Sequence, residues 1–255
     1  MRKRGYHQQV DKKKQKRKKG YIFLNIIACL LVVVGVVLIF QQPIRDYLLS
    51  MKIASHEAVA KTVTAQEIEQ NNAQEANFDF ESLHALSLQS VLEANIDSSQ
   101  VKSIGEIAIP SVEINLTIAK GVSDLNMTVG AGTLRPDQVM GQGNYTLASH
   151  YSSYGGGKLL FTPLHRISTG AKIYITDLKN VYVYDVYWYE IVPATHVDLV
   201  DDVKDDKIIT LITCEDGNAI NRLAVRGRLS ATYSTENAPK EALEAFQIMK
   251  NGRQV

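Results

Sequence analysis

The chain has 255 residues and a formal net charge of +1, but its charges are unevenly distributed. Residues 1–20 carry ten of the 28 Lys and Arg side chains and one of the 27 acids, so residues 21–255 keep 18 basic and 26 acidic side chains. A basic segment of this kind often binds nucleic acid. The apolar segment that follows indicates instead that these basic residues flank a membrane helix, so we expect no nucleic-acid partner.

Residues 21–40 form an uncharged apolar segment with one polar side chain, Asn25. About twenty apolar residues suffice to cross a hydrocarbon core of roughly 30 Å. The alternative, a cleaved signal peptide, has an apolar core of about 7–15 residues and a small-residue cleavage site, and the exit Phe40-Gln41-Gln42-Pro43 lacks such a site. We therefore expect an uncleaved single-pass membrane helix. The basic flank predicts a cytoplasmic N-terminus at residues 1–20 and an extracytoplasmic remainder.

Residues 41–77 are rich in Ala, Glu, Gln and Lys, with Pro43 at the start. Their apolar residues recur loosely without a sustained heptad, which favours a helical stalk or linker, with a coiled-coil dimer as the alternative. We expect the extracytoplasmic domain to span residues 78–235, beginning with a lead-in helix before about residue 95. Residues 236–255 form a polar tail with a short helix and no second apolar span.

From Ile104 onward, short β-branched and aromatic runs alternate with turns, which predicts a mostly β domain folded as an antiparallel barrel or sandwich. The segment between Asn126 and Gly143 is rich in Gly and indicates a loop. Leu159–Ile167 favours a short helix or 3₁₀ segment. The predicted strands cover residues 104–110, 113–118, 144–150, 171–176, 181–192, 208–214 and 222–229.

One strand ends in a cysteine: the apolar run Ile208–Thr213 is followed by Cys214 and then by the turn residues 215–218. If the next run pairs back as a hairpin, Arg222 begins the neighbouring strand close to the thiol. The other cysteine, Cys29, lies in the membrane segment, so a bond between the two within one chain is implausible. An unpaired extracytoplasmic thiol is uncommon. A buried structural cysteine and a catalytic one are both compatible with this position.

A catalytic thiol requires a base, and the extracytoplasmic domain offers three histidines beyond its lead-in segment. His150 ends a predicted strand, as expected for a Cys/His acyl-transfer site. His165 is interpreted as an exposed residue of a helical turn, and His196 as a loop residue. Arg222 could stabilise a developing oxyanion, although a charge at a surface strand edge explains it equally well.

The motifs Thr210-Leu211-Ile212-Thr213-Cys214, Arg222 and Leu147-Ala148-Ser149-His150 together resemble the sortases, the membrane-anchored cysteine transpeptidases of Gram-positive bacteria. The resemblance covers about residues 104–233, and the N-terminal anchor is similar to that of class A, the housekeeping type. It implies a closed barrel of about eight strands. It also implies an enzyme in which Cys214 attacks the Thr–Gly bond of an LPxTG-type signal, His150 transfers protons and Arg222 stabilises the oxyanion or holds the peptide. The partners would be LPxTG-bearing surface proteins and the amine of lipid II or of a peptidoglycan cross-bridge.

The resemblance further implies a substrate groove with one set of residues on the strands and another on the loop before the cysteine strand: Ala148, Thr210, Ile212, Thr213, Val197, Leu199 and Val200. Some class A members bind calcium through two acids of the second strand. Here Glu113 fits one position but Leu116 stands at the other. We therefore expect no metal or other cofactor, and activity without calcium, although the acidic loop 198–206 leaves calcium binding open.

Three alternatives remain at this point. An anchored cysteine peptidase would use the same thioester with water as acceptor. A pilin-type sortase would usually carry a second membrane span and a lid, for which the sequence gives no sign. A non-enzymatic adhesin or sensor domain would use Cys214 only for packing.

Overall fold

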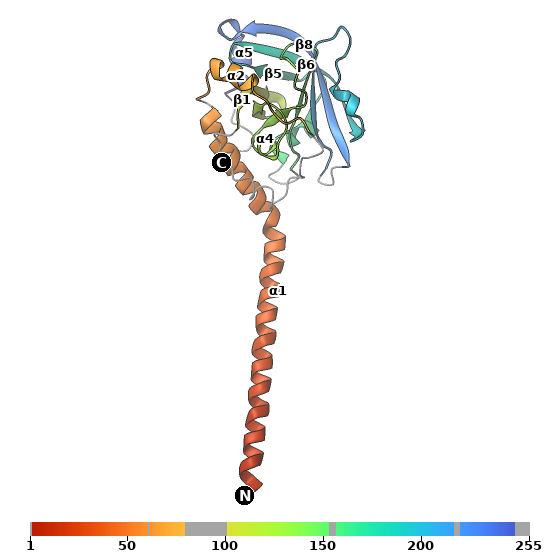
Figure 1. Cartoon of the computed structure of the whole chain (residues 1–255). Helices are drawn as coiled ribbons and strands as arrows, with labels where there is room; N and C mark the ends of the chain where they lie inside the picture. The colour runs from red at the N-terminus through yellow and green to blue at the C-terminus, as the bar shows by residue number, and fades with distance from the viewer. Residues whose placement is uncertain (1, 61, 80–100, 153–156, 217–219, 248–255) are drawn as a thin grey trace. The chain divides into compact units, whose positions relative to one another are not determined.

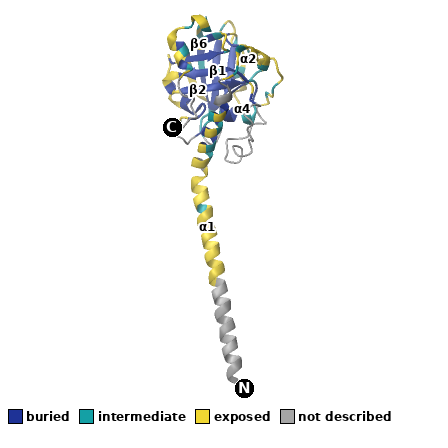
Figure 2. Cartoon of the chain, turned by 90° about the vertical axis from the view of Figure 1, so that its left-hand side faces the viewer, coloured by how far each residue is buried: buried dark blue, intermediate teal, exposed yellow. Residues whose placement is uncertain are grey.

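The computed structural model describes residues 2–60, 62–79, 101–152, 157–216 and 220–247. Its first element is helix α1 (Arg2–Ala60). Within it, the 21-residue segment Tyr21–Gln41 is apolar, and its side chains are almost entirely exposed, as Figure 2 shows in yellow. This segment is long and apolar enough to cross a bilayer. The chain divides into two compact units at Pro43, one of residues 1–42 and one of residues 43–255.

Eight strands in the described part of the second unit form a closed barrel, four of which, β1, β5, β6 and β8, are labelled in Figure 1. The order of the strands around the barrel is β1-β2-β3-β4-β7-β8-β6-β5. The closed barrel of about eight strands expected above is confirmed. Neighbouring strands are antiparallel except for the pairs β2–β3 and β4–β7, which are parallel. The strands are β1 (Ser103–Ile109), β2 (Ile114–Ala119), β3 (Ala131–Thr133), β4 (Asn144–Ala148), β5 (Lys172–Thr176), β6 (Asn180–Pro193), β7 (Ile208–Cys214) and β8 (Asn221–Ser234).

The barrel interior is filled by aliphatic side chains from successive strands, as closure of a small barrel requires. Ile107, Leu116, Leu147, Leu211 and Val225 are all at most 1% exposed and belong to one core cluster. β2 is buried along its whole length. These β-branched and leucine-rich runs are the ones that predict strands in the sequence.

Short helices connect and cover the strands. They are α2 (Ala65–Asn72), α4 (Asp124–Val129) and α5 (Lys240–Ala245), with 3₁₀ turns η3 (Pro110–Val112), η5 (Thr162–Arg166), η6 (Val197–Val200) and η7 (Thr235–Asn237). The predicted loop at 126–143 contains part of α4 and all of β3. α4 is capped by the Ser123 side chain, which accepts a hydrogen bond from the Asn126 backbone N–H. The lead-in helix expected before residue 95 lies outside the described residues for most of its length.

Part of the segment expected as a stalk packs on the barrel. Leu49 and Ile53 of α1 are buried in the main core cluster. In α2, Ile68 is also buried, and Asn71 donates a hydrogen bond to the Ser103 backbone oxygen at 2.9 Å. Leu49 and Ile53 therefore pack against the barrel of their own chain.

Candidate active site

Cys214 and Arg222 face each other at the turn end of the β7–β8 hairpin. The two residues are register partners in the antiparallel pair, and the Glu215 N–H donates to the Asn221 carbonyl at 3.0 Å just beyond them. The six preceding residues of β7 are buried, whereas Cys214 is half-buried. The hairpin predicted from the sequence therefore places a thiol at the mouth of a buried strand with a guanidinium opposite.

His150 reaches the same level from the other side of β7. β4 runs parallel to β7 with Ala148 paired to Ile212, and the Ser149 N–H donates to the Ile212 carbonyl at 3.2 Å. The Ser149 hydroxyl donates to the Gly130 carbonyl at 2.6 Å, which fixes the end of the strand. His150 lies two residues beyond the last β4–β7 pair, Ala148–Ile212, and Cys214 lies two residues beyond Ile212, so the three residues proposed from separate motifs lie at the same end of the β4–β7–β8 sheet.

The electrostatic environment favours the neutral forms of the Cys214 thiol and the His150 imidazole. Burial raises the pKa of the Cys214 thiol; the positive charge of Arg222 opposes this rise, and Asp216 adds to it. Burial lowers the pKa of His150 to about 4, with Asp124 opposing the decrease and Arg45 adding to it. Desolvation disfavours the charged form in both cases. At neutral pH the resting site therefore holds a thiol and an uncharged imidazole.

An apolar groove of about 200 Å³ adjoins the site. Arg222 lies at its wall, and η6 supplies three of its lining residues. Four residues predicted for the substrate groove line it: Val197, Leu199, Val200 and Ile212. A groove that is mostly apolar with one charged group suits an apolar peptide segment whose polar end lies at the thiol.

The other three predicted groove residues are differently placed. Ala148 is buried in the cluster that also contains Leu199 and Ile212. Thr213 is buried, and its Oγ1 has no hydrogen-bond partner among the described residues. Thr210 is fully buried and donates its hydroxyl to Asn144 Oδ1 at 2.7 Å, so it connects β7 to β4 and does not line the groove.

Acidic side chains of the loop 198–206 pair with arginines. Asp202 accepts hydrogen bonds from Arg135 at 2.9 Å and from the Asn144 N–H at 2.8 Å. Asp206 accepts from Arg228 through both carboxylate oxygens. Among the residues that the structure describes, there is no group of three or more His, Cys, Asp or Glu side chains that could hold a metal ion.

The sequence does not predict that His165 and Arg226 lie beside the site. His165 of η5 is exposed, and its Nε2 lies 3.3 Å from the carbonyl oxygen of Cys214. Its ring makes an edge contact with Tyr151, with ring centroids 5.1 Å apart. Arg226 donates to the Leu199 carbonyl at 3.1 Å and thereby holds η6 over the groove. Both contacts join segments far apart in the sequence, so only the folded chain brings them together.

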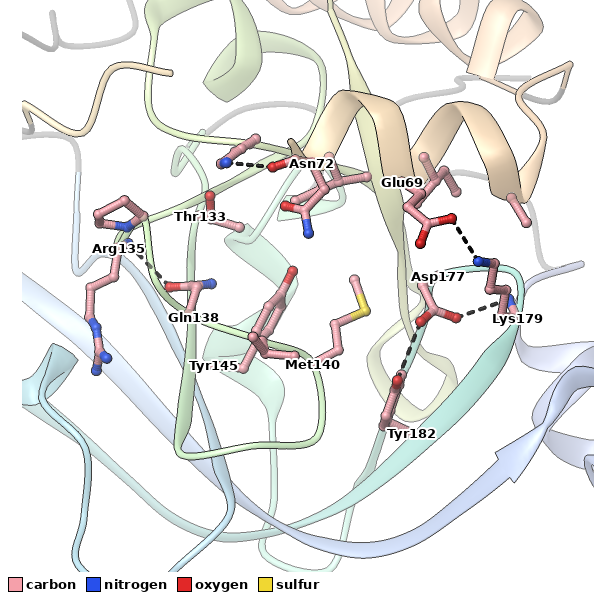
Figure 3. A pocket seen from close by; sticks show the side chains of 16 residues that line it. Glu69, Asn72, Thr133, Arg135, Gln138, Met140, Tyr145, Asp177, Lys179 and Tyr182 are labelled. Carbon is pink, nitrogen blue, oxygen red and sulfur yellow. Dashed lines mark hydrogen bonds and ion pairs between the residues drawn. The ribbon is translucent and has the colours of Figure 1, made fainter. Parts of the chain in front are cut away.

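A second cavity of about 220 Å³ lies between α2 and the barrel (Figure 3). Figure 3 shows Glu69, Asp177 and Lys179 on one side of it and Gln138 and Tyr145 on the other. Glu69 and Lys179 form an ion pair at 2.8 Å. None of the predicted site residues lines this cavity, so it is separate from the candidate active site.

Comparisons with known proteins identify the family. The profile of the sortase domain matches residues 107–230. Sortase A of Streptococcus agalactiae is 36% identical over 242 residues, which cover 92% of this chain and 97% of that protein. Sortase A of Listeria monocytogenes is 40% identical over 191 residues, which cover 74% and 83% respectively. The chain belongs to the sortase family.

Within that family it is a class A sortase and thus a cysteine transpeptidase. The solved structure of Listeria monocytogenes sortase A is 40% identical with a TM-score of 0.52, covering 56% of this chain and 97% of that one. Sortase C-3 of Streptococcus pneumoniae shares the fold, with a TM-score of 0.58 at 19% identity, over 78% of this chain and 100% of that one. The closed barrel is therefore a sortase barrel. The non-enzymatic interpretation of the chain is set aside.

Proposed function

We propose that this sortase cleaves LPxTG-type signals between Thr and Gly with Cys214 as nucleophile, His150 as acid–base and Arg222 as the charged donor. The acyl group passes to the amine of lipid II or of a peptidoglycan cross-bridge. One observation carries the proposal: Cys214 pairs with Arg222 on one neighbouring strand, and His150 follows the end of the other neighbouring strand, beside an apolar groove that Arg222 and Ile212 line.

Because the Cys214 thiol and the His150 imidazole are both neutral at rest, the first step is a proton transfer between them. The thiol proton of Cys214 passes to the His150 imidazole, and the Sγ thiolate attacks the carbonyl carbon of the signal threonine. The thiolate–imidazolium form is a minor fraction because burial disfavours both charges. A minor fraction is sufficient because the attack consumes it continuously.

Arg222 then stabilises the oxygen that gains charge in the tetrahedral intermediate. The His150 imidazolium gives its proton to the leaving glycine amine, so the C–N bond breaks and a thioester remains on Cys214. The neutral imidazole next takes a proton from the acceptor amine as its nitrogen bonds to the acyl carbon. The C–S bond then breaks, which leaves a new amide, and the imidazolium returns its proton to the Cys214 thiolate.

The groove supports the choice of signal. Leu199, Val200 and Ile212 present apolar surface to a peptide, and burial of apolar area is the main source of its affinity. The leucine and proline of the signal would occupy this surface, which leaves the threonine carbonyl at Cys214.

The membrane helix supports the proposed location. The basic residues 1–20 would remain in the cytoplasm, the segment 21–40 would span the membrane, and the domain from residue 78 to 235 would act outside. In this arrangement the enzyme meets surface proteins and lipid-linked acceptors on the outer face of the membrane.

The test uses the full-length protein in detergent micelles with an LPxTG peptide and a glycyl amine. We expect a thioacyl adduct on Cys214 by peptide mass mapping, and an amide product when the amine is present. Cys214→Ala should abolish cleavage with an unchanged melting temperature. Cys29→Ala is the matched thiol control, and it should retain full cleavage activity. Cleavage that yields only the free acid at saturating amine would support the anchored peptidase instead, and full activity of Cys214→Ala would reject the assignment.

A further inference from the structure

The turn of α1 at residues 45–46 contacts the loop that follows His150. Ser152 is buried, and its hydroxyl donates to Asp46 Oδ1 at 3.1 Å and accepts from Arg45 Nη2 at 3.1 Å. Arg45 and Asp46 also pair with each other at 2.9 Å. The Ser152 N–H donates to Thr162 Oγ1 at 2.8 Å. The backbone two residues after His150 is therefore held from two directions, by α1 and by η5.

This contact is buried and rigidly supported. The Arg45 and Asp46 side chains are 13% and 3% exposed, and Leu49 and Ile53 on the following turns of α1 are in the main core. A buried ion pair adds little net stability, because removing its two charges from water costs about as much as their attraction returns. Their value is geometric, because a guanidinium and a carboxylate fix the position of the hydroxyl between them.

Arg45, on the same turn of α1, also affects the pKa of His150. The charged groups whose fields act on the imidazole are Arg45 of α1, which lowers its pKa, and Asp124 of α4, which raises it. On the barrel side, Cys214 of β7 is the titratable group at the same register level, with Arg222 of β8 opposite it.

We propose that Arg45 and Asp46 are positioning residues of the active site, which hold the backbone after His150 through their hydrogen bonds to Ser152. The inference rests on the proposed role of His150. It means that the helix that anchors the enzyme also completes the site, so the docking of residues 43–53 on the barrel and the acid–base behaviour of His150 depend on each other.

The first experiment measures the pKa of His150 directly, in full-length protein labelled with [13C]histidine in micelles, with the signal assigned by its loss in His150→Gln. Arg45→Ala should raise this pKa and Asp124→Asn should lower it, each by about half a unit or more. Arg45→Lys keeps the charge and should stay near wild type. Lys172→Ala removes an exposed cation paired with Asp185 and should shift nothing. No change in Arg45→Ala, with the fold retained, would overturn the charge part of the inference.

The second experiment tests positioning without changing charge. Ser152→Ala should lower kcat severalfold with little effect on KM, because the groove is untouched, and should leave the pKa of His150 near wild type. An unchanged kcat would overturn the positioning part. The histidine titration needs no substrate, so its result stands even if the LPxTG peptide is not cleaved. Failure of the proposed function would instead appear as full activity of Cys214→Ala.

Discussion

His165 Nε2 lies 3.3 Å from the carbonyl oxygen of Cys214, so a side chain from η5 fixes the backbone at the end of β7. The sequence suggests only an exposed residue, whose removal should cost little. The contact changes that expectation, because a donor on this carbonyl limits the movement of the thiol relative to His150. The matched residue is His196, which is exposed at the groove and, among the described residues, is not hydrogen-bonded to Cys214.

We predict that His165→Ala lowers kcat by about three- to tenfold, the effect of one hydrogen bond worth roughly 1 kcal/mol. His165→Asn should recover part of the loss if its amide reaches the same carbonyl, and His196→Ala should stay near the wild-type kcat. Steady-state kinetics on an LPxTG peptide measures all three. Equal kcat values for His165→Ala and His196→Ala would contradict the prediction.

Arg222 carries a larger predicted effect. Removing one charged donor to an oxyanion typically costs on the order of 10²–10³ in kcat, and we expect Arg222→Ala to lose activity in this range with a thermal midpoint close to wild type. Arg228→Ala is the control on the same strand, since Arg228 pairs with Asp206 at the surface. A loss below tenfold in Arg222→Ala would remove Arg222 from the proposed mechanism.

The pH dependence follows from the directions of the two pKa shifts. As pH falls through about 4, His150 takes up a proton from solvent and can no longer accept the thiol proton, so kcat/KM should decline there. As pH rises, the thiol ionises without generating an imidazolium, and this alkaline decline should lie above the usual thiol range because burial raises the pKa of Cys214. We therefore expect a broad bell-shaped profile of kcat/KM. A narrow profile centred between pH 6 and 7 would contradict both shifts.

The groove prediction uses two exposed apolar residues. Val197 is 73% exposed and lines the groove, whereas Ile220 is 70% exposed and does not. Val197→Ser should raise KM for an LPxTG peptide about threefold to fivefold through lost apolar contact, and Ile220→Ser should leave KM unchanged. Because both side chains are exposed, neither variant should affect stability. Equal KM values would place the peptide elsewhere.

The sequence predicts local features of this site more reliably than long-range ones. The run Ile208–Thr213 is β-branched, so the strand that presents Cys214, and its hairpin with Arg222, follow from local pattern. The parallel pairing of β4 with β7 joins segments far apart in the chain, and the sequence pattern, which predicts antiparallel strands, is wrong at this pair. The sequence predicts Leu49 and Ile53 as part of a stalk, because the local spacing of apolar residues does not indicate that these two face the barrel. His165 gains its role from the packing of η5, which no periodicity encodes.

Substitution of Thr210 and Thr213 in β7 distinguishes a structural role from a substrate-binding role. Thr210 donates a buried hydrogen bond to Asn144, so Thr210→Val should reduce the free energy of unfolding by about 1–2 kcal/mol and leave KM unchanged. Thr213 is equally buried, but its Oγ1 has no partner among the described residues, so Thr213→Val should not lower stability. If the bound peptide uses that hydroxyl, Thr213→Val should still lower kcat/KM severalfold. Urea unfolding and peptide kinetics on the pair give both readouts. Loss of stability without loss of activity in Thr213→Val would show that its hydroxyl serves the fold and not the substrate.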